Sequence, residues 1–272
     1  MFSIVILTLN EEENLPACLA STAGCDDVVV LDSGSTDRTV ELARAAGARV
    51  EVNPFVDFAA QRNHAHRSIA FRHPWVFHLD ADEQLTPALV AECAARAEGD
   101  DGTLDGCWVA PKMFFLGRWI PHCTDFPAWQ ARFVHVGRFT FIEVGHGQRE
   151  HPAMRMGRLR ENYRHDLSSH GEAGWDAKHR RYAEAEARTL AADHTPLLPL
   201  GRRLLAGPAL ERRRALKQLS HRLPARPWLR FIYQYLLRGG FLDGRPGLRY
   251  CRLLARYERY TDEAVRALRA RT

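Results

Sequence analysis

The sequence predicts an α/β fold, in which a mostly parallel sheet has helices on both faces and is followed by a basic, helical C-terminal extension. Three observations lead to this fold class. In residues 1–100, short apolar runs alternate with helical patterns, which is the rhythm of β-α-β units. Most of these runs are continuously apolar and rich in β-branched residues, as strands buried on both faces are. After residue 157 the pattern becomes mostly helical and rich in arginine.

Each apolar run of the first half is expected to form a strand, and each is followed by a segment with helical periodicity. The expected strands are residues 2–9, 28–31, 49–52 and 75–79, and the expected helices are residues 15–23, 36–46, 58–69 and 87–97. Gly47 suits the end of the second helix, and Pro87 suits the first turn of the fourth. In such a sheet, ligands bind beyond the carboxyl ends of the strands.

The second half has a different pattern. We expect strands at residues 107–115 and 132–142, separated by an aromatic, turn-rich loop, and then helices at residues 174–192, 202–219 and 249–269. The predicted domains are therefore a nucleotide-binding and catalytic domain at 1–170 and a helical extension at 171–272.

Charge is divided unevenly along the chain. Residues 1–150 contain 12 Lys and Arg against 21 Asp and Glu, whereas residues 151–272 contain 26 against 12. A basic region of this kind indicates an anionic partner, such as lipid headgroups or a phosphorylated substrate. Nucleic acid is not expected as a partner, because no module that reads it can be identified.

The expected compartment is the cytoplasm. The first residues read as a buried strand and lack the basic region and cleavage site of a signal peptide, and no apolar run approaches the roughly 18 residues of a spanning helix. The six cysteines form no C-x-x-C pair, which is typical of buried thiols in a reducing compartment.

Three polar clusters follow the first, second and fourth expected strands, at residues 8–11, 32–35 and 80–82. Asp80 and Asp82 could share Mg²⁺ or Mn²⁺, which then bridges diphosphate oxygens; alternatively, they are an acidic cap of the next helix. Asp32 could accept a hydrogen bond from a base or a ribose, although Ser35 or Thr36 could also simply cap the following helix. Because all three clusters lie on one rim, we predict a binding site there.

Several segments resemble a known family. They are SIVILTLNEEENL from residue 3, DDVVVLDSGSTDRTVELA from residue 26, QRN at 61–63 and WVFHLDADEQL from residue 75. In this order and spacing they resemble the family 2 glycosyltransferases of the GT-A fold. FPAWQARF from residue 126, RPWLRFIYQYLLRGGFLDGRPG from residue 226 and K-x-x-R-Y at 178–182 resemble its lipopolysaccharide-core β-glucosyltransferase branch, the WaaE-like enzymes. The resemblance is strong over residues 1–85 and looser to about residue 260.

The resemblance implies roles for individual residues. Nucleotide-sugar binding would fall to Thr8, Asn10, Glu11, Asp32, Arg62, Asn63 and Asp80, with Lys178 and Arg181 neutralising the diphosphate. The metal ligands would be Asp80 and Asp82, with the late His165 as a further candidate. Each of Arg62, Asn63, Lys178 and Arg181 could instead be an ordinary helix-surface residue, and His165 could be a packed histidine.

The general base is less well defined. Relatives carry an acidic residue in an E-D or H-E pair after the acceptor-side strands, and Glu150 takes that place when the sequence is counted back from His165. Arg149 stands where the branch usually has histidine, so the transfer is imperfect. Asp125 and Glu143 are the rival bases.

These features together predict an inverting, metal-dependent hexosyltransferase that takes its sugar from a nucleotide sugar, with UDP expected by family analogy. Its acceptor would be a hydroxyl of a lipid-linked or cell-envelope glycan. The alternative is a catalytically inactive module of the same fold that binds an anionic glycan or a membrane surface. A dinucleotide-dependent dehydrogenase is excluded, because the turn after the first strand lacks G-x-G-x-x-G.

The composition of residues 226–238 predicts that this segment binds at a membrane surface. It mixes Trp, Tyr and aliphatic residues with arginine at both ends, a composition suited to a bilayer interface. Residues 196–272 hold 18 Lys and Arg against 5 Asp and Glu. We therefore expect residues 200–260 to dock on the inner face of the cell membrane; alternatively, this segment is a helix packed on the catalytic core.

Overall fold

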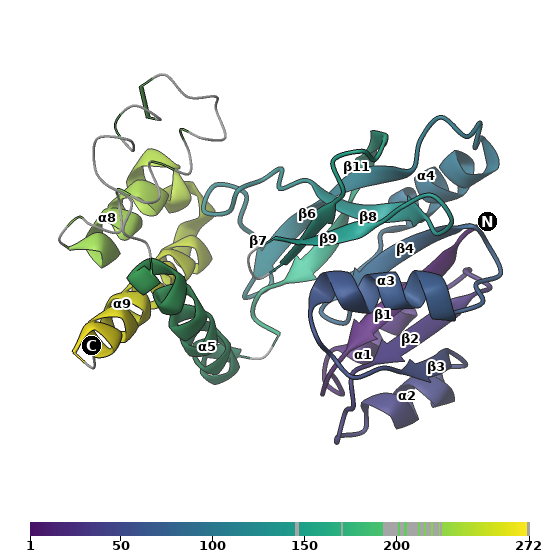
Figure 1. The fold of residues 1–272 in the computed structure, drawn as a ribbon, viewed down its shortest axis with the longest axis horizontal. Helices are drawn as coiled ribbons and strands as arrows, with labels where there is room; N and C mark the ends of the chain where they lie inside the picture. Colours follow the sequence, from purple (N-terminus) through teal and green to yellow (C-terminus); the bar gives the residue numbers. More distant parts are fainter. Residues whose placement is uncertain are drawn as a thin grey trace. The chain divides into compact units, whose positions relative to one another are not determined.

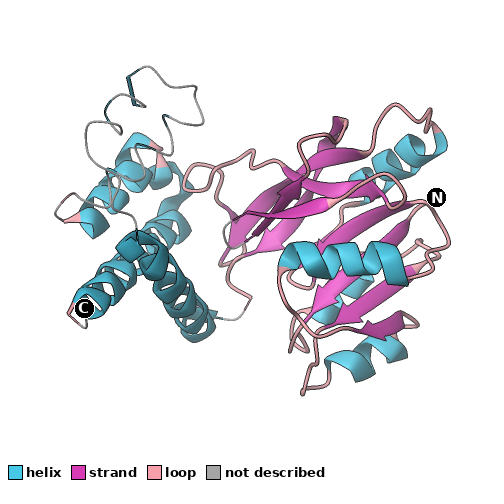
Figure 2. Ribbon diagram, in the orientation of Figure 1, coloured by secondary structure: helices cyan, strands magenta, loops and turns pink. Residues whose placement is uncertain are grey.

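The computed structural model describes residues 1–144, 147–169, 171–192 and 225–270, together with isolated positions between 201 and 223. It divides into two compact units. The first comprises Met1–Trp119 and Asp125–Ser169, and the second comprises Ile120–Thr124 and His170–Thr272. Figures 1 and 2 show a sheet-based first unit and a helical second unit. The short Ile120–Thr124 segment groups with the helices, whereas the predicted boundary lies only at residue 170; separate folding of 1–170 and 171–272 stays a prediction.

Parallel strands form the first half of the sheet, in the order β3-β2-β1-β4. Their bounds are Ser3–Thr8 for β1, Val28–Asp32 for β2, Arg49–Val52 for β3 and Trp75–Asp80 for β4. The helices between and after them are α1 (Leu15–Ala20), α2 (Thr39–Ala45), α3 (Phe58–Ser68) and α4 (Pro87–Glu98). The side chain of Asp57 caps α3 and that of Thr86 caps α4, each by accepting a backbone N–H.

The sheet buries both faces because successive side chains of a strand point to opposite sides. Ile4 and Ile6 of β1 belong to a core that includes residues of α1, α2 and α4. Val5 and Leu7 belong to a second core that includes Ala65 of α3, and Figure 1 shows α3 in front of these strands. The predicted fold class is therefore confirmed, with helices on both faces of a mostly parallel sheet.

The sheet continues from β4 in the order β8-β6-β11-β5, with β7 paired to β6. These strands are β5 (Glu83–Gln84), β6 (Gly106–Phe115), β7 (Arg118–Trp119), β8 (Gln130–His135) and β11 (Met156–Asp166). Strand β8 runs antiparallel to both β4 and β6, whereas β11 runs parallel to β6. A separate hairpin consists of β9 (Phe141–Val144) and β10 (Gly147–Glu150).

Two expectations for the second half were wrong, and a third cannot be compared. The single strand expected at 132–142 is two strands, because the chain turns between His135 and Phe141 and β9 pairs with β10 in a separate hairpin. The change to helices was predicted too early, after residue 157, since β11 runs to Asp166. The helix expected at 202–219 lies almost wholly outside the described residues.

The second unit contains α5 (Gly171–Ala192), α8 (Arg226–Ile232), a π-helical turn η1 (Tyr233–Leu237), a 3-10 turn η2 (Gly240–Asp243) and α9 (Gly244–Arg269). Helix α9 packs against both α5 and α8. Buried ion pairing supports this packing, since Arg226 of α8 contacts Glu258 of α9 at 2.7 Å. Among the described residues, no helix is both long and apolar enough to cross a bilayer.

Candidate functional site

Asp32 organises the turn that follows β2. Its carboxylate accepts hydrogen bonds from the Thr8 hydroxyl at 2.8 Å and from the backbone N–H groups of Gly34 and Ser35 at 2.9 and 2.7 Å. The Ser35 hydroxyl donates to it as well. Asp32 and Thr8 are almost fully buried, and they are paired neighbours in the β1–β2 register. The turn at this rim is therefore fixed by charge-assisted hydrogen bonds.

Asn10 and Glu11 join the loop after β1 to the same turn. The Asn10 side-chain oxygen accepts the Thr36 backbone N–H at 2.8 Å, and the Asn10 backbone N–H donates to the Ser35 hydroxyl at 2.8 Å. The Glu11 backbone N–H donates to the hydroxyl of Thr39, at the start of α2. Asn10 adopts φ 56°, a left-handed conformation that asparagine tolerates better than most residues. The structure thus brings together the four predicted residues of the first two clusters.

Asp80 ends β4 beside two arginines. Its carboxylate accepts from Arg62 of α3 at 2.7 Å and from Arg132 of β8 at 2.9 Å. Although burial opposes the charged form, Arg132 and Arg62 lower the pKa of Asp80. Both arginines are nearly fully buried. In addition, Nε and Nη1 of Arg62 are buried and have no hydrogen-bond partner among the described residues.

Two members of this cluster, Glu83 and Arg132, were not predicted from the sequence. Glu83 is fully buried, accepts from Arg132 at 2.8 Å and accepts the Asp80 backbone N–H at 2.9 Å. Burial raises the pKa of the Glu83 carboxyl. One signal in the sequence could have indicated Arg132. It is an arginine in the largely apolar segment FPAWQARF, where a strand was expected to begin.

Asp82 and His165 meet because β5 pairs with β11. The register places His165 opposite Glu83, and the Asp166 backbone N–H donates to the Asp82 backbone oxygen at 3.1 Å. The His165 Nε2 lies 3.3 Å from the Asp82 carboxylate. Burial opposes the imidazolium, but Asp82, Glu83 and Asp80 together raise the pKa of His165 to about 9.

The chemistry of this pair fits a divalent cation. A carboxylate oxygen and an imidazole nitrogen are both common metal ligands. The second ring nitrogen, His165 Nδ1, lies 3.6 Å from the Glu83 carboxylate. The third predicted ligand, Asp80, faces the two arginines. Within the described segments, no three His, Cys, Asp or Glu side chains are grouped so that they could hold a metal ion.

Asn63 and Glu150 are linked through Phe141. The Asn63 side chain donates through Nδ2 to the Phe141 carbonyl at 2.9 Å and accepts the Phe141 backbone N–H through Oδ1 at 3.0 Å. Phe141 is paired with Glu150 across the β9–β10 hairpin, and the Arg62 guanidinium lies 5.9 Å from the Phe141 ring centroid. Glu150 is half-buried. The hairpin that carries Glu150 is therefore tied to α3, the helix that carries Arg62.

The remaining predicted residues are less closely connected to the rim. Asp125 and Glu143 are exposed, and Lys178 and Arg181 lie on the exposed side of α5 in the second unit. Gly145 and His146, which precede the Glu150 strand, lie outside the described residues. The roles assigned to these side chains by resemblance stay predictions.

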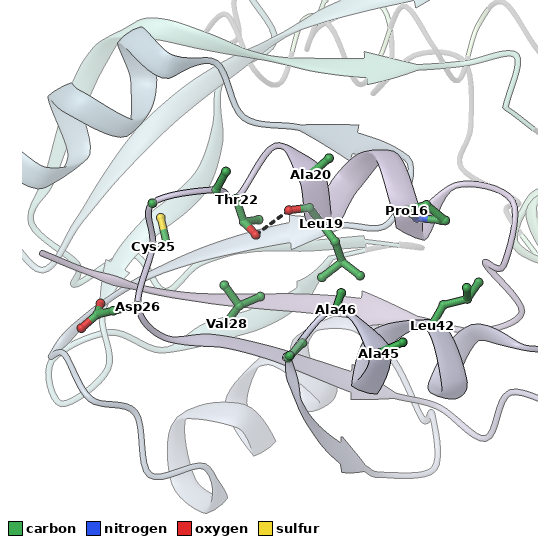
Figure 3. A pocket seen from close by; sticks show the side chains of 14 residues that line it. Pro16, Leu19, Ala20, Thr22, Cys25, Asp26, Val28, Leu42, Ala45 and Ala46 are labelled. Atoms are coloured by element: carbon green, nitrogen blue, oxygen red, sulfur yellow. Dashed lines mark hydrogen bonds between the residues drawn. The ribbon is translucent and has the colours of Figure 1, made fainter.

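A pocket elsewhere in the first unit is shown in Figure 3. Its lining comes from α1, the turn after it, the start of β2, and α2 with the turn that follows it; it includes Leu19, Val28, Leu42 and Ala46. It shares no residue with the predicted nucleotide-sugar site. The pocket therefore does not bear on the function of the rim.

Two buried histidines beside the site predict a pH dependence of stability. His66 Nε2 lies 2.8 Å from His78 Nε2, and burial lowers the pKa of His66 to about 4 and that of His78 well below 6.5. Neutral histidines stabilise the fold above about pH 6.5, and the contribution is lost as pH falls toward 4. We expect the unfolding free energy to decline by up to about 1.4 kcal/mol per pH unit and per histidine in this window.

Urea unfolding at several pH values between 7 and 4.5 would measure this decline. His66→Gln should reduce the slope but not remove it, because glutamine does not titrate and His78 remains. An unchanged slope in that variant would contradict the assignment.

Comparison with known proteins identifies one matching family. The family model described as Glycosyl transferase family 2 matches residues 3–157, which is more than half of the chain and includes the rim, the Arg62 cluster and the β9–β10 hairpin.

Curated relatives match shorter stretches. The lipopolysaccharide core biosynthesis glycosyltransferase LpsC of Rhizobium meliloti is 39% identical over 120 residues, covering 42% of this chain and 43% of LpsC. An uncharacterized glycosyltransferase of Rickettsia typhi is 36% identical over 91 residues, covering 33% of this chain and 30% of that protein. The matches thus span less than half the length of either relative.

Similar solved structures include glucosyl-3-phosphoglycerate synthase of Mycobacterium tuberculosis in complex with Mn²⁺, UDP-glucose and phosphoglyceric acid. That chain is 25% identical, with a TM-score of 0.33 and coverage of 43% of this chain and 44% of that chain. Residues 1–349 of TarS from S. aureus are 16% identical, with a TM-score of 0.42 and coverage of 100% and 92%.

Proposed function

The chain belongs to glycosyl transferase family 2, and from this we propose that it is an inverting, metal-dependent glycosyltransferase. It would move a hexose from a nucleotide sugar, with UDP the favoured nucleotide, to a hydroxyl of a lipid-linked or cell-envelope glycan. The observation that carries the proposal is the shared rim. Asp32 and Asp80 end β2 and β4, the two strands that flank β1. Asp82 follows β4 directly and lies beside His165, which is near the carboxyl end of β11.

Each part of the rim suits one part of the donor. The Asp32 turn, with Thr8, Asn10 and Glu11, would hold the nucleoside. Arg62 would place positive charge beside the sugar and phosphate oxygens and would hold Asp80 in position. Asn63 would support this site through its hydrogen bonds to Phe141, rather than through a free side chain. Lys178 and Arg181 are proposed to neutralise diphosphate charge.

Asp82 and His165 would hold a divalent cation, with Asp80 as the third ligand proposed from the resemblance. A nitrogen ligand beside carboxylates favours Mn²⁺ over Mg²⁺, which takes almost only oxygen ligands. The bound ion would supply positive charge beside the diphosphate leaving group.

Glu150 would act as the general base. It would take the proton from the acceptor hydroxyl as the hydroxyl oxygen forms a bond to the anomeric carbon. The bond between that carbon and the diphosphate oxygen breaks, and its electron pair leaves with the nucleotide. This displacement inverts the configuration at the anomeric carbon. Asp125 is the alternative base.

The acceptor class is proposed from charge and from sequence resemblance. The basic second half of the chain suits the anionic inner face of a cell membrane, where each basic residue contributes about 1 kcal/mol to binding. We propose a cytoplasmic protein that associates peripherally with that face. The second candidate function is an inactive module that binds an anionic glycan or surface, and the same basic charge favours it. This function would give no role to the Asp82–His165 pair.

A thermal-shift experiment tests donor binding directly. We expect UDP and UDP-hexoses to raise the melting temperature in the presence of Mn²⁺ and much less in its absence, because ligands that bind the native state stabilise it by mass action. Slow, Mn²⁺-dependent hydrolysis of a UDP-hexose would separate an enzyme from an inactive module. No stabilisation by any nucleotide or nucleotide sugar, with or without Mn²⁺, would contradict the proposed function.

A further inference from the structure

The elements from α8 to η2 expose an unusual amount of apolar side chain. Trp228 is 68% exposed and Leu237 is 76% exposed. The other large apolar side chains exposed in this stretch are Leu229, Ile232, Tyr233, Leu236, Phe241 and Leu242. We call these eight residues the apolar face. Single exposed apolar residues are ordinary, whereas a cluster of this size in one short stretch indicates an interaction surface.

Spacing within the helical turns supports one continuous face. Trp228, Ile232 and Leu236 follow one another at intervals of four residues, as do Leu229, Tyr233 and Leu237. Residues four apart are neighbours on a helix surface. The two rows therefore lie side by side along α8 and η1.

The charge around this face suits an anionic lipid surface. Residues 225–270 contain ten arginines and four acidic residues. Three of these arginines form ion pairs with acidic side chains, namely Arg226, Arg249 and Arg256. Two of the four acidic side chains, Asp243 and Glu258, are buried and paired with His122 and Arg226. Aromatic and aliphatic residues bordered by arginine are the composition of helices that lie in a bilayer interface.

The same elements hold the segment Ile120–Thr124 with their other side chains. The buried Asp243 carboxylate accepts the backbone N–H groups of His122 and Cys123 at 3.0 and 2.8 Å, and His122 Nδ1 donates to it at 2.7 Å. Gln234 donates to the Cys123 carbonyl at 2.7 Å. Arg238 donates to the Thr124 carbonyl at 3.0 Å.

Close packing leaves little room for this segment to shift. A Cβ added to Gly240 would lie 2.7 Å from the Gln234 carbonyl oxygen and 3.2 Å from the Cys123 Cβ. A Cβ on Gly247 would lie 2.6 Å from the Asp243 Cβ. The glycines thus allow the turn around Asp243 to approach the segment closely. From η1 to η2, the polar residues that bond the Ile120–Thr124 segment alternate with residues of the apolar face. One short piece of backbone therefore carries both the contacts to this segment and the exposed apolar side chains.

We propose that the apolar face inserts into the interface of an anionic bilayer, and that this docking orders the Ile120–Thr124 segment. This inference rests on the proposed lipid-linked acceptor. Insertion would restrict η1 and η2, and their hydrogen bonds to residues 122–124 would then open less often. The segment is directly followed by Asp125, so docking would fix the start of the loop that leads to β8.

Hydrogen–deuterium exchange with and without vesicles tests the coupling. The probes are vesicles of phosphatidylglycerol and phosphatidylethanolamine, compared with vesicles of phosphatidylcholine alone. We expect the full chain to float with the anionic vesicles, and exchange in a peptide covering residues 117–126 to slow by about tenfold. Leu237→Glu should reduce flotation by about tenfold and remove the slowing. Val56→Glu is the matched control, because Val56 is equally exposed, at 79%, in the first unit.

Two variants separate docking from coupling. Asp243→Asn and Gln234→Leu weaken the hold on residues 122–124 but leave the apolar face intact, so each should still float while vesicles no longer slow exchange at 117–126. Wild-type flotation without slower exchange would overturn the coupling, as would equal slowing in both variants. Absence of flotation would overturn the docking itself, while Mn²⁺-dependent stabilisation by UDP would still test the proposed donor site separately.

Discussion

Asp82→Asn is expected to reduce turnover at least about 100-fold, the scale seen when one preorganised electrostatic contact to a transition state is removed. The substitution keeps the shape of the side chain but removes the negative charge that faces His165 at 3.3 Å. A divalent cation would then lose a charged ligand. Mn²⁺-dependent stabilisation by UDP should disappear with the activity, and both can be measured on the same preparation.

The fold should survive this change. The link between Asp82 and Asp166 runs through the Asp82 backbone oxygen, which asparagine retains. Asp101→Asn is a suitable control, because Asp101 is an exposed carboxylate that bonds Thr103 within its own turn. The control should match the wild type in activity and in nucleotide binding. Full wild-type activity in excess EDTA would contradict the metal assignment.

The parallel half of the sheet could be predicted from the sequence because its signals are local. Strand β3 has the predicted bounds, Arg49–Val52. Strands β2 and β4 differ from their predictions by one residue at one end, and β1 is one residue shorter at each end. The apolar runs of β1, β2 and β4 are nearly continuous because helices cover both faces of these strands. Strand β11 was not predicted because it carries many charged residues, such as Arg158, Arg160 and Glu161. Its place in the sheet depends on pairing with β6 and β5, which no local pattern reveals.

The candidate site could be predicted in part, because some of its residues directly follow strands that the sequence predicts. Residues at strand ends, such as Asp32 and Asp82, follow from the topology of a parallel sheet. Arg132 and Glu83 could not be predicted in this way, because their importance lies in ion pairs between strands distant in the sequence. The double hydrogen bond of Asn63 to Phe141 likewise joins residues 78 positions apart. Sequence pattern gives positions along an element, whereas such contacts depend on how elements pack.

Glu150→Gln is expected to leave UDP-sugar affinity nearly unchanged and to reduce turnover by about 100-fold or more, the lower end of what a general base contributes. Glutamine preserves the size of the side chain and cannot accept the acceptor proton. Glu150 ends β10 opposite Phe141, whose backbone is held by Asn63. Its position is therefore fixed by backbone pairing and by α3, and the substitution should not move the hairpin. Donor affinity is measured by thermal shift with Mn²⁺, and turnover by release of UDP.

Asp125→Asn provides the matched comparison, since it removes the rival carboxylate in the same isosteric way. If Glu150 is the base, Asp125→Asn should lower turnover far less than Glu150→Gln. The reverse pattern, with Asp125→Asn inactive and Glu150→Gln close to wild type, would assign the base to Asp125. The exposed Glu143 lies on β9, in the same hairpin. Glu143→Gln therefore tests a general effect of lost negative charge at this hairpin, and it should leave turnover within about threefold of the wild type if proton transfer is specific to Glu150.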